Sequence, residues 1–112
     1  LPIFEIVEVL AVSRQNIVDV LLDIPERFLL KAAFPNPFNP VTTIGFDVPN
    51  PSNVKLIVYD LVGRQVAQLV DDYQHPGNYF INWDATGLPS GMYLIKMTAD
   101  DFISTQKVML VK

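Results

Sequence analysis

Few residues in this sequence have the types and the spacing that catalysis requires. His75 is the only histidine, and it stands in a polar stretch before Pro76 and Gly77. A general base needs a nucleophile or an orienting partner within hydrogen-bond reach, and no suitable residue occurs at a useful spacing. The absence of cysteine also excludes disulfides, thiolate metal sites and thiol nucleophiles. The sequence therefore predicts a protein that is not an enzyme and has no cofactor.

Two pairs of adjacent carboxylates, at 71–72 and 100–101, raise the question of calcium binding. Calcium sites use several oxygen ligands at a patterned spacing, whereas adjacent aspartates point to opposite sides of a strand. Asn82, Asp84 and Thr86 alternate as oxygen donors, but so short a set is ordinary for a loop. We therefore favour turns and loops over a metal site.

The aromatic residues permit a different function, the binding of a sugar by ring stacking. The candidates for such a platform are Tyr59, Tyr79, Phe80, Trp83 and Tyr93. Trp83 shares one face of a predicted strand with Tyr79 and Ile81, and a stripe of this kind is more often core. We therefore favour a buried Trp83. An extracellular accessory module that binds carbohydrate or acts as a spacer is the alternative function.

Composition narrows the class of protein further. Half of the 112 residues are hydrophobic and 18% are charged, which suits the core of one compact domain. The net charge is −4 and the eight basic residues form no patch, so we expect no nucleic-acid partner. No apolar run reaches the ~18–20 residues of a transmembrane segment. Residues 1–12 lack the features of a signal peptide, and we expect the chain to be a fragment of a longer protein.

Residues 41–112 alternate between short β-forming runs and turn signals. Within 41–48 (VTTIGFDV), Ile44, Phe46 and Val48 fall on one face, the period of two that is typical of a half-buried strand. Similar patterns predict strands at 28–33, 41–48, 54–60, 65–70, 79–83, 92–98 and 102–111, with loops at 71–78 and 84–91. No helical crossover separates them, so the expected fold is all-β, an Ig-like antiparallel β-sandwich of about seven strands.

The stretch FPNPFNP at residues 34–40 joins the first two predicted strands. Each proline fixes φ and restricts the residue before it, so the stretch should be a rigid corner. We expect Phe34 and Phe38 to fill gaps at the end of the core. Asn36 and Asn39 should bond nearby backbone groups.

Several blocks together resemble the C-terminal sorting domain of the type IX secretion system. They are 25–44 (PERFLLKAAFPNPFNPVTTI), 54–66 (VKLIVYDLVGRQV), 82–84 (NWD), 90–93 (SGMY) and 107–112 (KVMLVK). They keep the order and spacing of the family over residues 23–112. Phe34 stands where the family usually has tyrosine, Ala32 and Ala33 replace a more common polar pair, and the loop 84–89 is short for the family.

The resemblance implies a folded sorting signal without chemistry of its own. Members of the family sit at the end of exported bacterial proteins and direct them across the outer membrane through a translocon. A sortase-like cysteine peptidase then usually removes the domain, and the cargo is often anchored to a lipopolysaccharide. We therefore expect a route through the periplasm and outer membrane to a secreted or cell-surface location.

Residues 1–22 have no counterpart in this family. Residues 3–12 suit a strand, and Ser13 suits the cap of a short helix that Pro25 would end. We expect 1–22 to be a linker or the end of the preceding cargo domain, and 23–112 to be the sorting domain.

The resemblance also indicates which residues partners would recognise. We expect recognition or sorting to involve Pro35, Asn36, Pro37, Gly63, Gly91, Tyr93, Lys107, Val108, Leu110 and Lys112. Gly63 and Gly91 would act through backbone geometry. Near its end the last strand is apolar on both faces, so it should be covered by the N-terminal segment or offered to a partner. Its edge could take a strand of the secretion machinery or form a homodimer.

Overall fold

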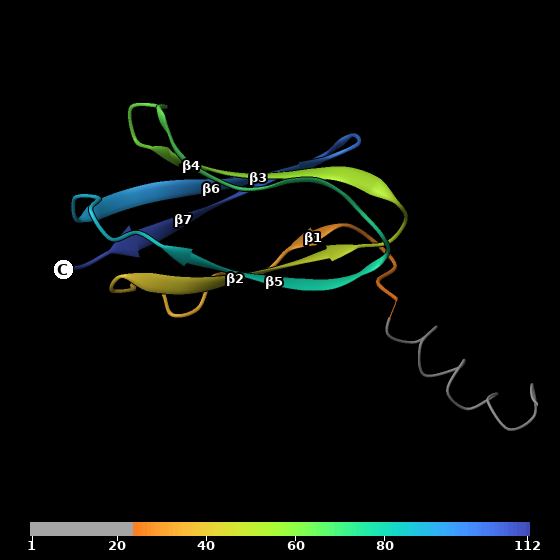
Figure 1. Cartoon of the computed structure of the whole chain (residues 1–112), viewed down its shortest axis with the longest axis horizontal. Helices are drawn as coiled ribbons and strands as arrows, with labels where there is room; N and C mark the ends of the chain where they lie inside the picture. The colour runs from red at the N-terminus through yellow and green to blue at the C-terminus, as the bar shows by residue number, and fades with distance from the viewer. Residues whose placement is uncertain (1–23) are drawn as a thin grey trace, which may run out of the picture.

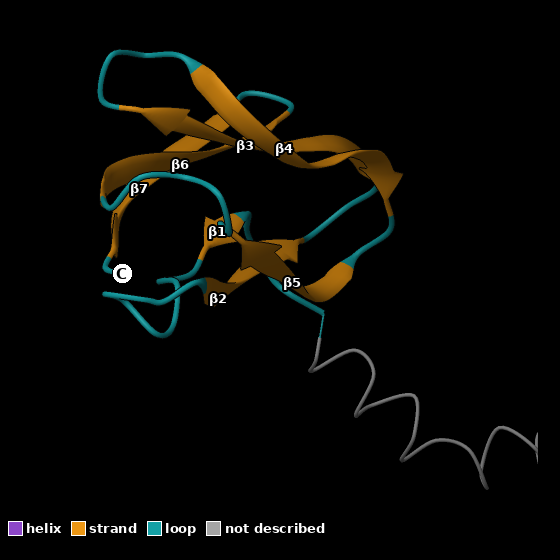
Figure 2. Cartoon of the chain, turned by 60° about the vertical axis from the view of Figure 1, so that its left-hand side comes forward, coloured by secondary structure: helices purple, strands orange, loops and turns teal. Residues whose placement is uncertain are grey.

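The computed structural model describes residues 24–112, which form two antiparallel sheets packed face to face (Figure 1, Figure 2). The smaller sheet has the order β1-β2-β5, with β1 (Leu29–Leu30), β2 (Val41–Val48) and β5 (Gly77–Asp84). The larger sheet has the order β4-β3-β6-β7, with β3 (Ser52–Asp60), β4 (Gln65–Gln74), β6 (Gly91–Ala99) and β7 (Phe102–Leu110). This confirms the predicted seven-stranded, all-β sandwich. The segment 1–22, with its expected strand and helix, lies outside the described residues.

The core forms because alternate side chains of the long strands point between the sheets. Ile44, Phe46 and Val48 of β2 are buried, as their spacing predicts. Trp83 of β5 is also buried, which confirms the core interpretation of this residue. Its ring centroid lies 5.2 Å from that of Phe38 and 5.8 Å from that of Tyr93, so aromatic contacts fill the core from several directions.

Several predicted element boundaries are wrong, and the largest differences are at β4 and at the first strand. β4 continues to Gln74 through residues that we predicted as loop, because an edge strand with solvent on one side tolerates polar side chains such as Asp71 and Asp72. The first strand is shorter than 28–33. The Ala33 N–H donates to Oε1 of Gln106 at 2.9 Å, so the chain here contacts the larger sheet, although Lys31 and Phe34 still pair with β2 on either side. Among residues 24–112, no helix has the length and apolarity to cross a membrane.

The connections gather at two opposite ends of the sandwich (Figure 1). We call one of them the tail end, because the C-terminus lies there with the β1–β2 loop, the β3–β4 turn and the β5–β6 loop. The far end carries the other three connections, at 49–51, 75–76 and 100–101. The proline stretch, the hairpin turn and the SGMY and KVMLVK blocks therefore meet at the tail end.

Candidate recognition surface

The proline segment (residues 34–40) lies against the tail (residues 107–112), although about 70 positions separate them in the sequence. The N–H of Phe38 donates to the carbonyl of Met109, and the N–H of Val111 donates to the carbonyl of Phe38, each at 2.9 Å. These bonds make a short parallel bridge between Phe38 and Leu110 on the outer edge of β7. The edge of the last strand is therefore paired at the tail end.

The side chain of Asn36 extends this pairing. Its Nδ2 donates to the carbonyl of Lys107 at 3.1 Å, and its Oδ1 accepts from the N–H of Met109 at 3.0 Å. One amide thus bonds two backbone groups as a neighbouring strand would. Asn36 thus bonds backbone groups, as predicted, but these groups belong to β7, about 70 positions away in the sequence, and not to the proline segment itself.

The two phenylalanines of the proline segment have different roles. Phe38 is 2% exposed and packs on Trp83, which confirms its predicted place in the core. Phe34 is 79% exposed, so the expectation that it fills the core is wrong. Its backbone pairs with Thr43 in both directions, at 2.9 and 3.0 Å, and Thr43 faces solvent on the outside of the smaller sheet, where its Oγ1 bonds Asn82.

Further bonds fix the proline segment to its own sheet. Oγ1 of Thr42 donates to the carbonyl of Pro35 at 2.7 Å, and the N–H of Ala85 donates to the carbonyl of Pro40 at 2.9 Å. Pro35 and Pro37 lie exposed between these attachments. The segment is therefore a braced corner with Pro35 and Pro37 facing solvent.

The half of β7 nearer the far end differs from the tail in the pairing of its outer edge. β7 is the last strand of its sheet, and Ile103 is 64% exposed there. Gln106 marks the boundary, since its Nε2 donates to the carbonyl of Lys31 at 2.7 Å and joins the two sheets. An edge strand without a neighbour presents backbone donors and acceptors to other chains.

The β3–β4 turn is shaped by Gly63 and Asp60. Gly63 has φ of 92°, as its predicted place in a tight turn requires. Oδ1 of Asp60 accepts from the backbone N–H groups of Val62 and Arg64 at 3.0 and 2.9 Å, and its Oδ2 accepts from Nε of Arg64 at 2.8 Å. The backbone bond from Arg64 lowers the pKa of Asp60, burial opposes this shift, and the side-chain bond from Arg64 adds to it.

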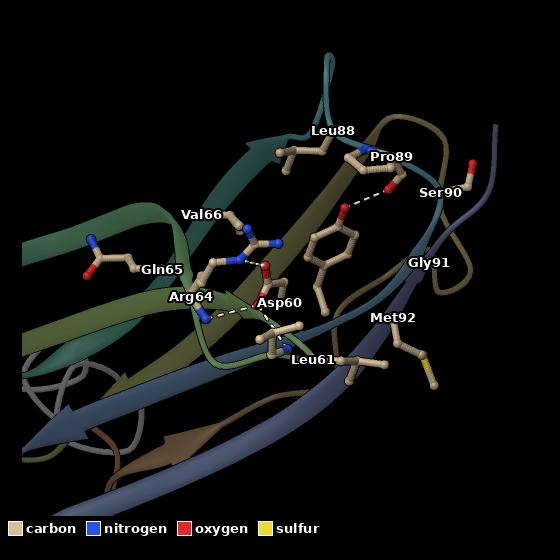
Figure 3. Close-up of a pocket in the computed structure, with 12 residues that line it drawn as sticks. Asp60, Leu61, Arg64, Gln65, Val66, Leu88, Pro89, Ser90, Gly91 and Met92 are labelled. Carbon is tan, nitrogen blue, oxygen red and sulfur yellow. Dashed lines mark hydrogen bonds and ion pairs between the residues drawn. The ribbon is translucent and has the colours of Figure 1, made fainter.

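A pocket of about 500 Å³ lies between this turn and the β5–β6 loop (Figure 3). Gly91, with φ of 151°, and Tyr93 form part of its lining. The hydroxyl of Tyr93 donates to the carbonyl of Pro89 at 2.6 Å and thereby holds the loop. Oγ of Ser90 accepts from the N–H of Lys112 at 3.1 Å, so the pocket adjoins the tail.

Two exposed residues at this end were missed by the sequence reasoning. Leu61 and Val62, at the tip of the turn, are 65% and 80% exposed. The signal was visible, since two aliphatic residues directly before a turn glycine have no core position to occupy. They form an apolar projection that lines part of the pocket.

The predicted recognition residues fall into two groups. Tyr93, Val108 and Leu110 are buried, whereas Lys107 and Lys112 are exposed on the tail. Of the aromatic residues considered for sugar stacking, Trp83 and Tyr93 are core, and only Phe80 is more than one-third exposed. Within residues 24–112, no three histidine, aspartate or glutamate side chains gather as a metal site.

Comparison with known proteins agrees with the resemblance of the sequence blocks. No curated protein matches the chain. A family model described as the secretion system C-terminal sorting domain matches residues 32–112, a range that contains the proline segment, the tail and every strand from β2 to β7. The chain therefore belongs to the secretion system C-terminal sorting domains, the type IX secretion signals through which proteins reach the cell surface or are secreted.

Proposed function

We propose that the outer-membrane translocon of type IX secretion recognises this domain at its tail end. The observation that carries the proposal is the attachment of the tail by Asn36 and Phe38, through bonds of 2.9 to 3.1 Å. Because these residues hold a strand that is distant in sequence, the recognised surface is composite. The folded domain, and not the tail sequence alone, is then the signal.

The predicted recognition residues take different parts in this proposal. Pro35, Pro37, Lys107 and Lys112 are exposed and would contact the partner directly. The buried set acts indirectly, by positioning the loops and the tail, and consists of Tyr93, Val108 and Leu110. Gly63 and Gly91 allow the backbone turns at positive φ.

The domain in this proposal carries no catalytic activity, and cleavage is done by a partner. A sortase-like cysteine peptidase removes the domain after passage and leaves the cargo anchored at the cell surface. A peptidase needs an extended substrate, and the longest loop between strands is the braced 31–40 segment. This supports a cleavage point before β1.

The test is surface display of an exported reporter that carries the 112-residue chain, in a bacterium with type IX secretion. Asn36→Asp keeps the acceptor for the Met109 N–H and removes the donor to Lys107, which should lower the free energy of unfolding by about 1 kcal/mol. The variant should stay folded, yet lose most of its display. Asn53→Asp, at an exposed position of β3, is the matched control.

A second reporter, without residues 107–112, should not reach the surface. Circular dichroism on the purified variants separates loss of recognition from loss of folding. Equal display of the Asn36→Asp, Asn53→Asp and truncated reporters would contradict a composite signal.

A further inference from the structure

We propose that the pocket beside the tail binds an extended peptide segment of the partner in which an aliphatic side chain adjoins a carboxylate. This inference rests on the proposed function and names the chemistry of the contact. The volume of about 500 Å³ lies within the range of ~300–1,000 Å³ that is usual for binding pockets.

Much of the pocket lining is apolar, and this selects the first part of the ligand, the aliphatic side chain. The apolar side chains come from the turn, from β4 and from the β5–β6 loop and β6, and include Leu61, Val66, Leu88 and Met92 (Figure 3). Leu61 and the neighbouring Val62 are largely exposed. A partner side chain that covers them removes apolar surface from water, which is the main favourable term in association.

The charged residues of the pocket select the second part of the ligand, the carboxylate. Arg64 is the only cation in the lining and Asp60 the only acid. Both oxygens of Asp60 already accept from the turn, and the bond to Arg64 uses only Nε of the guanidinium. The Arg64 side chain is 78% exposed, so its Nη groups can reach a ligand. A planar guanidinium pairs best with a carboxylate or phosphate.

A carboxylate in a peptide fits better than an anionic glycan. Polyanions are held by clusters of Lys and Arg, whereas this pocket has one arginine and the whole chain has a net charge of −4. The apolar lining would also face the hydroxyl groups of a sugar without bonding them. An aliphatic residue next to Asp or Glu satisfies both parts of the pocket.

The pocket is built before the ligand arrives. The bonds of Asp60 fix the turn, the bond from Tyr93 to Pro89 fixes the opposite loop, and Ser90 is tied to Lys112. A preformed site loses less conformational entropy on binding than a mobile loop does. The contact with Lys112 places the pocket within the composite surface, so one partner segment can lie along both.

The experiment titrates the ¹⁵N-labelled 112-residue chain with a set of blocked tetrapeptides. In each peptide a central Leu, Val, Met, Ala or Gly precedes either Glu or Gln. We expect saturable shifts at the backbone amides of residues 61–66 and 90–92, strongest for Leu-Glu. The Leu-Gln peptide should bind about five-fold more weakly at low salt, as an exposed ion pair implies.

Arg64→Gln should remove the difference between the Glu and Gln peptides, whereas Arg27→Gln, at an exposed position far in sequence, should preserve it. Leu61→Ser should weaken both peptides equally. Absence of saturable shifts, or an unchanged preference in Arg64→Gln, would overturn the inference. Shifts with glucose 1-phosphate but not with the peptides would assign the pocket to an anionic sugar and overturn it as well.

Display of the reporter separates this inference from the proposed function. If Arg64→Gln is displayed normally while Asn36→Asp is not, the composite signal stands and the pocket plays no part in it. If both are displayed normally, the proposed function fails independently of any peptide binding.

Discussion

The two ends of the sandwich close their hairpins in different ways. At the far end the β6–β7 turn consists of Asp100 and Asp101, polar residues of the kind that solvent-exposed turns usually carry. At the tail end the β3–β4 turn exposes Leu61 and Val62 instead. Exposed aliphatic pairs give nothing to the stability of a turn, and the peptide contact that we propose for this end would cover them.

The two ends also differ in the hydrogen bonds that attach their connections to the rest of the fold. The far-end turn is attached through one side chain, since Oγ of Ser52 donates to Oδ2 of Asp100 at 3.0 Å. The tail end is attached through the proline segment, by bonds to β7 from both Asn36 and the backbone of Phe38. The proline segment thus ties the tail end together by several bonds between distant parts of the chain, and such a preformed arrangement would suit the recognition that we propose for this end.

The largest expected effect comes from removing the anchor of the proline segment. Phe38→Ala should lower the free energy of unfolding by about 3–5 kcal/mol, because it leaves a cavity beside Trp83. Phe34→Ala is the control in the same segment and should change it by less than about 0.5 kcal/mol, since Phe34 is exposed. Urea unfolding of both variants measures this. Equal effects would mean that Phe38 does not hold the tail end.

A smaller effect should distinguish the glycines of the two ends. Gly63→Ala should cost about 1–2 kcal/mol, because φ of 92° is unfavourable for a residue with a Cβ. Gly77, next to the far-end connection, has no such φ, and a Cβ there would meet Tyr79 at 3.6 Å, an ordinary contact. Gly77→Ala should therefore be nearly neutral in thermal unfolding. If Gly77→Ala lowered the stability more than Gly63→Ala, the requirement for glycine in the tail-end turn would be contradicted.

The smallest expected effect concerns the stability of the fold at low pH. The pKa of Asp60 is lowered from 3.8 by its bonds to Arg64, so its charged form is favoured in the folded state. The stability that it contributes is complete above pH 3.8 and is lost as the pH falls below 3.8 through the folded pKa. Asp60→Asn should be less stable than the parent at pH 7, and the two should converge at lower pH. Denaturation curves at several pH values test this, and a constant difference would contradict it.

The strands were predictable from the sequence because alternation is a local signal. Ile44, Phe46 and Val48 identified β2 and its buried face without any tertiary information. The error at 71–74 has the same origin, since Asp71 and Asp72 are loop-like in composition and only their position on an edge strand allows them in a sheet. Local signals cannot tell whether a polar run has a neighbour.

The contacts of the candidate surface were not predictable in this way. The sequence identified Asn36, Gly63 and the tail as members of blocks, but not that Asn36 bonds β7. That bond depends on how the two sheets pack, which no spacing in the sequence encodes. Phe34 and Phe38 look alike in the proline segment, and only the packed structure shows that one is core and the other is exposed.

The attachment of β7 to the proline segment gives the signal a property that a linear tag lacks. Asn36 and Phe38 lie about 70 positions before their partners in β7, so these bonds can form only after both segments have been synthesised. A polypeptide that ends before β7 would lack both the tail and the bonds that hold it to the proline segment, and under the proposed function we expect it not to be exported. If the composite surface is the signal, as we propose, only a chain that includes β7 can present it.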